Sequence, residues 1–331
     1  MNFKQTINFS LWCDFIQKDF LDNKFKQLVD NQIIHGATSN PAIFKEAIVS
    51  SDAYAQQISI LKANPVKKIY EELAISDIKK AASILYPLYE EDNDDGFISL
   101  EVDPMLCDDA KATIEEGIRL YETIDYDNVM IKIPATKAGY EAMEELSAKG
   151  ININATLIFS PQQAIESTKA INKGMQKGLK TTKAVISVFV SRLDRMLDER
   201  LKKLNLKTAQ LGIINATKCY YEVEKFKNKN IRTLFASTGV KDDSLPQSYY
   251  IDNLIFPHSI NTAPLNTIES YIQNNNFIES DLKTEQECNE YFELLSTKDI
   301  NMQPIYNKLL QDGLDAFKVS FEELLNKIKL G

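Results

Sequence analysis

The chain has 331 residues, of which 44% are hydrophobic and 26% charged, with 11 glycines and 10 prolines. This profile is typical of a packed globular protein and excludes a disordered or fibrous one. The formal net charge of -9 argues against binding to nucleic acid or to an anionic membrane, because both need an extended basic surface.

Targeting and metal-binding signals are weak in this sequence. The first ten residues have no basic stretch followed by a long apolar run, and no later segment is apolar for the length of a membrane span. We therefore expect a cytoplasmic protein with no membrane partner. Four scattered cysteines without a C-x-x-C pair favour reduced thiols, and two histidines predict neither a metal site nor a serine-type triad.

Eight short apolar runs predict β-strands, and helix-period segments lie between them. The strands are expected at residues 7–13, 36–38, 98–102, 129–133, 153–157, 184–188, 233–236 and 260–262. The clearest helices are expected at 108–123, 137–148, 161–174 and 188–206. This alternation predicts parallel strands joined by right-handed crossovers, and eight such units predict an α/β protein with a (β/α)₈ barrel.

Local signals refine this plan. Asn40-Pro41 and Ser160-Pro161 each place a capping residue before a proline at a helix start, and Gln163 adds a capping box to the second. The acidic turn at residues 90–95 is most simply a solvated loop, with metal binding as the alternative.

Two stretches exceed a minimal barrel. Residues 43–97 carry two helical patterns, at 47–62 and 66–88, and we expect a helical insertion there. Helical segments at 264–273 and 281–295 precede a final helix with an apolar stripe that predicts packing on the barrel. The stripe contains Leu310, Leu314, Phe317, Phe321, Leu324 and Ile328. We expect one barrel domain over residues 1–331, with C-terminal helices at about 264–331.

Catalytic groups of such barrels lie at the C-terminal ends of the strands. Nearly every predicted strand ends near polar side chains. They are Asp14, Thr38 with Asn40, Glu101 with Asp103, Lys132, Asn154 with Thr156, Ser187, Ser237 and Asn261.

Lys132 is the most informative of these residues, because apolar residues flank it on both sides within its strand. A lysine is rarely buried without a reason. One reason is a structural pair with a carboxylate. The other is catalysis, since burial favours the neutral amine, which is the nucleophile of Schiff-base enzymes.

Schiff-base chemistry also needs groups that move protons, and a carboxylate beside the amine can serve. Asp14 and Glu101 are the candidates. The alternatives are a helix N-cap for Asp14 and a structural salt bridge to Lys132 for Glu101.

Two cations follow the sixth and seventh strands, in the part of a barrel that often binds phosphate. They are Arg192 and Lys241. Arg192 could instead pair with Asp194 or Asp198 on its own helix, and Lys241 could be a solvated loop lysine.

Six motifs, in order, resemble the transaldolase family. They are GATSNP at 36–41, EVD at 101–103, MIKIPAT at 130–136, INATLIFS at 153–160, FVSR at 189–192 and ASTGVK at 236–241. The resemblance implies a class I aldolase barrel that moves a dihydroxyacetone unit in the non-oxidative pentose phosphate pathway. The donor would be sedoheptulose 7-phosphate or fructose 6-phosphate, and the acceptor glyceraldehyde 3-phosphate or erythrose 4-phosphate. No metal or other cofactor is implied, sugar phosphates are the implied partners, and a homodimer is left open.

By position, Lys132 matches the Schiff-base lysine of the family and Asp14 the acid/base group for C–C cleavage. Glu101 and Thr156 match the pair that holds a catalytic water. The residues that match substrate contacts are Asn40, Asn154, Thr38 and Ser187 for the dihydroxyacetone unit and Arg192 and Ser237 for the phosphate.

One departure concerns the phosphate site, where some transaldolases have an arginine two residues after the serine. Gly239 stands there in this chain, and we assign the phosphate contact to Lys241 of the S-T-G-x-K turn. Related fructose 6-phosphate aldolases carry glutamine in place of Glu101 and tyrosine in place of Phe189. The residues present favour transfer; simple aldol cleavage and a non-catalytic sugar-phosphate-binding barrel are the alternatives.

Overall fold

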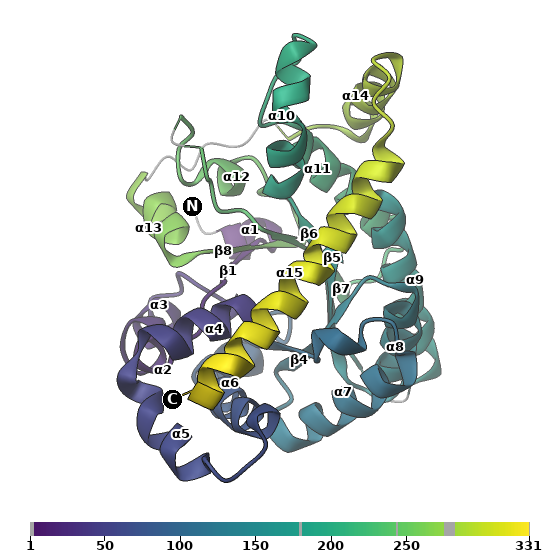
Figure 1. Cartoon of the computed structure of the whole chain (residues 1–331). Coiled ribbons are helices and arrows are strands. Elements are labelled where there is room, and N and C mark those ends of the chain that lie inside the picture. The colour runs from purple at the N-terminus through teal and green to yellow at the C-terminus, as the bar shows by residue number, and fades with distance from the viewer. Residues whose placement is uncertain (1–2, 179–180, 243, 275–281, 331) are drawn as a thin grey trace.

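The structure is a computed structural model, and it describes residues 3–178, 181–242, 244–274 and 282–330. Eight parallel strands close into a barrel in the order β1 to β8 (Figure 1). They are β1 (Ser10–Cys13), β2 (Gly36–Ala37), β3 (Phe97–Glu101), β4 (Val129–Pro134), β5 (Asn152–Ile158), β6 (Ala184–Phe189), β7 (Ile231–Ala236) and β8 (Ser259–Ala263). Each predicted strand overlaps one of them, and the barrel fold is confirmed.

The strand register decides which side chains meet at the mouth of the barrel. Glu101 at the end of β3 pairs with Lys132 of β4, and Lys132 pairs with Asn154 of β5. Residues paired in a parallel sheet lie on neighbouring strands at the same height, so these three side chains emerge close together.

Helices follow the later strands as expected. They are α7 (Ala110–Ile124), α8 (Lys137–Ala148), α9 (Pro161–Lys177), α10 (Ser191–Lys203), α11 (Leu211–Glu224) and the short α12 (Tyr249–Asp252). The capping box of α9 is present, with Ser160 and Gln163 bonded reciprocally. The helix predicted at 188–206 begins only at Ser191, because residues 188 and 189 belong to β6.

Three α-helices and a 3₁₀ turn connect β2 to β3, which confirms the extra helices expected after the second strand. They are α4 (Pro41–Ser50), η2 (Asp52–Tyr54), α5 (Ala55–Leu61) and α6 (Val66–Glu91). The single helix predicted at 47–62 is wrong. Ser51 is extended, with φ of -132°, and its side chain accepts a hydrogen bond from the backbone N–H of Ala53, so the first helix ends there.

The N-terminal region also differs from the prediction. The strand expected from residue 7 begins at Ser10, because α1 (Phe3–Ile7) precedes it and Asn8 adopts φ of 54°. A left-handed residue is a common way for a helix to end. Three short helical segments then fill the connection from β1 to β2: α2 (Lys18–Phe20), the π-helical η1 (Leu21–Phe25) and α3 (Lys26–Asp30).

The chain ends in α13 (Leu265–Asn274), α14 (Glu285–Thr297) and α15 (Met302–Leu330). The predicted segment 281–295 starts at a residue outside the described part. In Figure 1, α15 runs diagonally across the mouth of the barrel, and it contacts α4, α6 and β5. Most of its predicted apolar stripe is buried, as Phe317 and Phe321 illustrate. The assignment of the whole chain to one domain stays a prediction.

Among the described residues, no helix combines the length and apolar character needed to cross a membrane.

Candidate active site

A buried amine and a buried carboxylate face each other at the ends of β3 and β4. Lys132 is 4% exposed and Glu101 is 7% exposed, and 3.6 Å separates Nζ of Lys132 from Oε2 of Glu101. The same Nζ donates a hydrogen bond to the carbonyl oxygen of Ser39 at 2.9 Å. The loop between β2 and α4 therefore helps to hold the amine in place.

Glu101 can exchange a proton near neutral pH. Burial raises the pKa of its carboxyl to about 7, the positive charge of Lys132 opposes that rise, and the negative charge of Asp14 adds to it. A carboxyl whose pKa lies near the working pH is suited to accept and return protons during a reaction.

Two buried oxygens, one on β3 and one on β5, have unused hydrogen-bonding capacity. Within the described residues, neither Oε2 of Glu101 nor Oγ1 of Thr156 has a hydrogen-bond partner. Buried polar atoms are almost always paired, so an unpaired set suggests a place for a polar ligand or a water. Leu157, which follows Thr156, adopts φ of 56° beside an irregularity in β5. Such strain is common at functional sites.

Asp14 lies just after β1 and is tied to the next strand. Oγ1 of Thr38 donates a hydrogen bond to Oδ1 of Asp14 at 2.6 Å and lies 2.7 Å from Oγ1 of Thr262. Burial raises the pKa of Asp14, while Lys132 lowers it. The N-cap alternative is wrong, because the following helix begins at Lys18 with Gln17 at its cap.

Three polar side chains expected to contact the dihydroxyacetone unit are held firmly. Oγ of Ser187 donates to Oδ1 of Asn154 at 2.6 Å, and Nδ2 of Asn154 donates to Oγ of Ser99 at 2.8 Å. Asn40 caps α4 by accepting from the N–H of Ile43 at 3.0 Å, so its Oδ1 is held in place. Fixed donors and acceptors of this kind orient a small substrate at little entropic cost.

Arg192, on the first turn of α10, stacks on two aromatic rings. Its guanidinium carbon lies 5.0 Å from the ring centre of Phe189 and 6.0 Å from that of Phe159. Burial lowers the pKa of Arg192. In the described part of the chain it forms no ion pair, because Asp194 and Asp198 accept backbone N–H groups of the segment that follows α10. The guanidinium is thus available for an anion.

Ser237 approaches the same helix start. Its Oγ lies 3.2 Å from Oγ of Ser191, the first residue of α10, and it adopts φ of 56°. A serine hydroxyl at a helix N-terminus is well placed to bind phosphate together with an arginine.

Lys241 shares a cavity with Ser191, the neighbour of Ser237 at the start of α10. It is exposed and lines this cavity of about 450 Å³ together with Arg195, Asp198 and Tyr250. That cavity does not include Arg192 or Lys132. The solvated-loop alternative for Lys241 therefore remains open.

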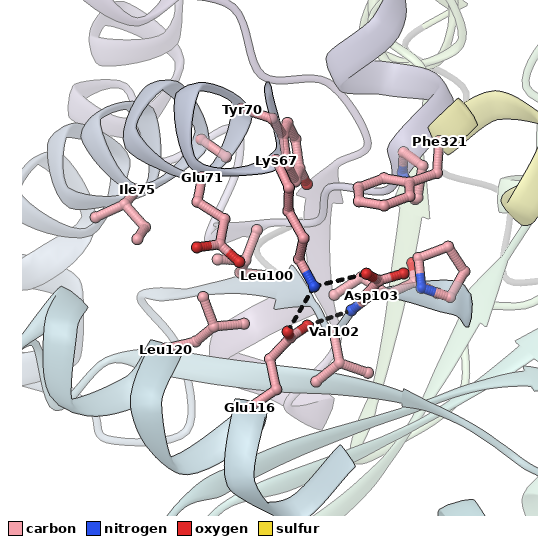
Figure 2. A pocket seen from close by; sticks show the side chains of 14 residues that line it. Lys67, Tyr70, Glu71, Ile75, Leu100, Val102, Asp103, Glu116, Leu120 and Phe321 are labelled. Carbon is pink, nitrogen blue, oxygen red and sulfur yellow. Dashed lines mark hydrogen bonds and ion pairs between the residues drawn. The ribbon is translucent and has the colours of Figure 1, made fainter. Parts of the chain in front are cut away.

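An ion-pair cluster behind the site fixes the end of β3 (Figure 2). Nζ of Lys67 lies 2.6 Å from Oδ2 of Asp103 and 2.9 Å from Oε2 of Glu116, and Oε1 of Glu116 accepts the N–H of Asp103 at 2.6 Å. The space among these residues is about 10 Å³, roughly the room of one water molecule. Because Asp103 is two residues beyond Glu101, the cluster restrains the catalytic end of the strand.

Sequence reasoning missed Lys67, Glu116 and Phe317. The first two come from α6 and α7, and Phe317 comes from α15, with its ring centre 5.8 Å from Nζ of Lys132. Helical periodicity marked Phe317 as apolar but could not say what it would cover. Among the described residues, no group of three or more metal-binding side chains lies together.

Comparisons with known proteins agree with this geometry. The family described as Transaldolase/Fructose-6-phosphate aldolase matches residues 11–328. A transaldolase from Helicobacter pylori is 49% identical over 319 residues, which cover 96% of this chain and 98% of that protein. A transaldolase from Campylobacter jejuni is 47% identical over 332 residues, with 97% and 99% covered.

A solved fructose-bisphosphate aldolase from Campylobacter jejuni is only a distant match. Its sequence identity is 11% and its TM-score 0.39, over 96% of this chain and 89% of that one, and it adds nothing to the assignment. The family match and the two close relatives, however, span nearly the whole chain. The chain therefore belongs to the transaldolase/fructose-6-phosphate aldolase family.

Proposed function

We propose that this chain is a transaldolase, which moves a three-carbon dihydroxyacetone unit from a ketose phosphate to an aldose phosphate. The observation that carries the proposal is the buried amine of Lys132, which faces Glu101 at 3.6 Å and lies in the electrostatic field of Asp14. A structural ion pair needs neither the second carboxylate nor the unpaired oxygens of Glu101 and Thr156.

The reaction starts at the amine. Lys132 attacks the ketose carbonyl carbon, and the carbinolamine loses water to give a protonated imine. Glu101 and Thr156, each with one oxygen that has no hydrogen-bond partner among the described residues, hold that water and move its protons. The imine then serves as the electron sink for bond cleavage.

Asp14 moves the proton in the cleavage and transfer steps that follow. Its carboxylate takes the proton of the substrate hydroxyl next to the scissile bond, the C–C bond breaks into the imine, and an aldose phosphate leaves. The enamine left on Lys132 attacks the acceptor aldehyde, Asp14 returns the proton, and hydrolysis releases the new ketose. Raised pKa values suit both carboxyls to this exchange.

Binding is divided between two ends of the substrate. Asn40, Asn154 and Ser187 hold the hydroxyl groups of the dihydroxyacetone unit, while Arg192 and Ser237 hold the phosphate. Thr38 orients Asp14 by donating to it at 2.6 Å. Phe189 supports the guanidinium of Arg192 at 5.0 Å and keeps the pocket apolar.

A coupled assay with fructose 6-phosphate tests this function. We expect release of glyceraldehyde 3-phosphate that depends on added erythrose 4-phosphate, without accumulation of free dihydroxyacetone. Accumulation of dihydroxyacetone without acceptor would identify an aldolase instead, and binding without turnover would identify a sugar-phosphate-binding barrel. A cytoplasmic location and a homodimer belong to the same proposal, and sedimentation of the purified chain tests the dimer.

A further inference from the structure

The final helix places an aromatic ring over the reactive amine. Phe317 of α15 is 5% exposed, and its ring centre lies 5.8 Å from Nζ of Lys132. The steps proposed above give this ring no role. An imine carbon would lie about 1.3 Å from Nζ, so a substrate bound to the amine comes close to the ring.

The approach of α15 to the barrel is close at a glycine one turn earlier. A Cβ at Gly313 would come within 2.9 Å of Cδ2 of Leu157 and 3.4 Å of Nη1 of Arg192. The helix backbone therefore rests against the strand that carries Thr156 and against the arginine expected to bind phosphate. This part of α15 therefore covers the candidate active site.

Contacts on both sides of Phe317 hold the helix in this position. Toward its start, the hydroxyl of Tyr306 donates to Oδ1 of Asn215 at 2.7 Å. Toward its end, the ring of Phe321 packs edge-on against Tyr70 at 5.3 Å. With contacts on either side, the position of the ring between them is fixed.

We propose that Phe317 is a specificity-determining residue that shields the enamine on Lys132 from bulk water, so that the three-carbon unit goes to an aldehyde. The proposal rests on the transaldolase function above. An apolar ring adjacent to the reactive carbon excludes water without offering a proton of its own.

The loss that Phe317 prevents has a defined chemistry. Bulk water protonates the enamine carbon, which gives the protonated imine of dihydroxyacetone and a hydroxide. The hydroxide adds to the imine carbon, the C–N bond breaks, and the proton of the added hydroxyl passes to nitrogen, which frees dihydroxyacetone and the amine. Together with cleavage, this splits fructose 6-phosphate into dihydroxyacetone and glyceraldehyde 3-phosphate, because the water lost in imine formation is regained.

The experiment measures the ratio of free dihydroxyacetone released to three-carbon units transferred to erythrose 4-phosphate. We expect Phe317→Ala to raise this ratio at least about 10-fold, and Phe317→Leu, which keeps an apolar side chain, to raise it severalfold. Both variants should still form a borohydride-stable adduct on Lys132. If Phe317→Ala does not fold, Phe317→Leu decides the matter.

The matched control is Phe321→Leu, which makes the same change one turn along the helix, against Tyr70. It should lower thermal stability as Phe317→Leu does and leave the ratio unchanged. An unchanged ratio in a folded Phe317→Leu protein would overturn this inference alone, as would an equal rise in Phe321→Leu. Loss of acceptor-dependent transfer in the unsubstituted protein would overturn the transaldolase function and this inference with it.

Discussion

The two ends of the barrel each bury an ion pair, and the two pairs differ in the number of hydrogen bonds that support them. At the N-terminal end, Nη1 of Arg232 lies 3.2 Å from Oδ1 of Asp95, and Nη2 donates to Ser10 and to two backbone carbonyls. At the C-terminal end, Lys132 and Glu101 stand 3.6 Å apart, and Oε2 of Glu101 has no hydrogen-bond partner among the described residues.

This difference separates a structural pair from a reactive one. The N-terminal face of such a barrel generally serves stability. Arg232 there donates five hydrogen bonds through Nη1 and Nη2, although its Nε has no partner among the described residues. At the C-terminal face, the support among the described residues is the one hydrogen bond from Lys132 to Ser39, and the unpaired atom is an acceptor, Oε2 of Glu101, which a water or a substrate hydroxyl can use. Burial of charge alone would not have distinguished the two ends.

The largest expected effect is on activity at the C-terminal pair. Lys132→Met removes the nucleophile, and we expect kcat to fall by at least about 1,000-fold. Stability should hold or rise, because an apolar side chain replaces a buried charge and Glu101 can take up a proton. The coupled assay and thermal unfolding measure both. A variant that keeps a tenth of the kcat would contradict the proposed mechanism.

The pair at the N-terminal end should show the reverse pattern. In the described part of the chain, Arg232→Met leaves Asp95 buried with Lys4, at 2.8 Å, as its one charged partner, and we expect a loss of about 3 to 4 kcal/mol in the free energy of unfolding. The kcat of the folded protein should not change. Arg119→Met is the control, since its half-exposed pair with Glu71 should contribute less than about 1 kcal/mol.

The pH dependence of stability also tests the difference between the two ion pairs. The pKa of Glu101 is raised to about 7, above its ordinary value of 4.5, so the folded state favours the protonated carboxyl. Stability is therefore lost as pH rises from about 4.5 through 7 and levels off above that. The Glu101→Gln protein should not lose stability in this way, because glutamine does not titrate.

Urea unfolding at pH 5 and pH 8 measures the effect. Relative to the unsubstituted protein, Glu101→Gln should gain about 2 to 3 kcal/mol between the two pH values. If the free energies of unfolding of Glu101→Gln and of the unsubstituted protein differ by the same amount at pH 5 and at pH 8, Glu101 does not titrate in this range.

The smallest effects concern the phosphate site. Arg192→Met should raise KM for fructose 6-phosphate about 10-fold to 100-fold, which corresponds to about 1.4 to 2.8 kcal/mol. Lys241→Met should raise it about threefold, because an exposed charge is screened. If Lys241→Met leaves KM unchanged while Arg192→Met raises it by the full amount, Lys241 is a solvated loop lysine.

The sequence predicted the barrel because short apolar runs alternated with helix-period segments, two of which begin with a capping residue and a proline. It also predicted that Asp14, Glu101, Lys132 and Thr156 would lie near one another, since the C-terminal ends of parallel strands meet at one face. The start of β1 and the break at Ser51 were missed, because each depends on a single backbone angle that apolar patterning does not report.

Residues from helices were the hardest to place. Lys67, Glu116 and Phe317 reach the site through the orientation of their helices, which tertiary packing decides. The acidic turn at 90–95 was read as solvated, and this was wrong for Asp95, which is 2% exposed. Its partner Arg232 lies 137 residues away in the sequence, so no local pattern connects them.

Trapping the covalent intermediate tests the central claim most directly. The protein is incubated with fructose 6-phosphate, reduced with borohydride, digested and mapped by mass spectrometry. We predict a stable three-carbon adduct on Lys132 and its absence in Lys132→Met. An adduct on another lysine, or none on a protein that turns over fructose 6-phosphate, would contradict the assignment of Lys132 as the nucleophile.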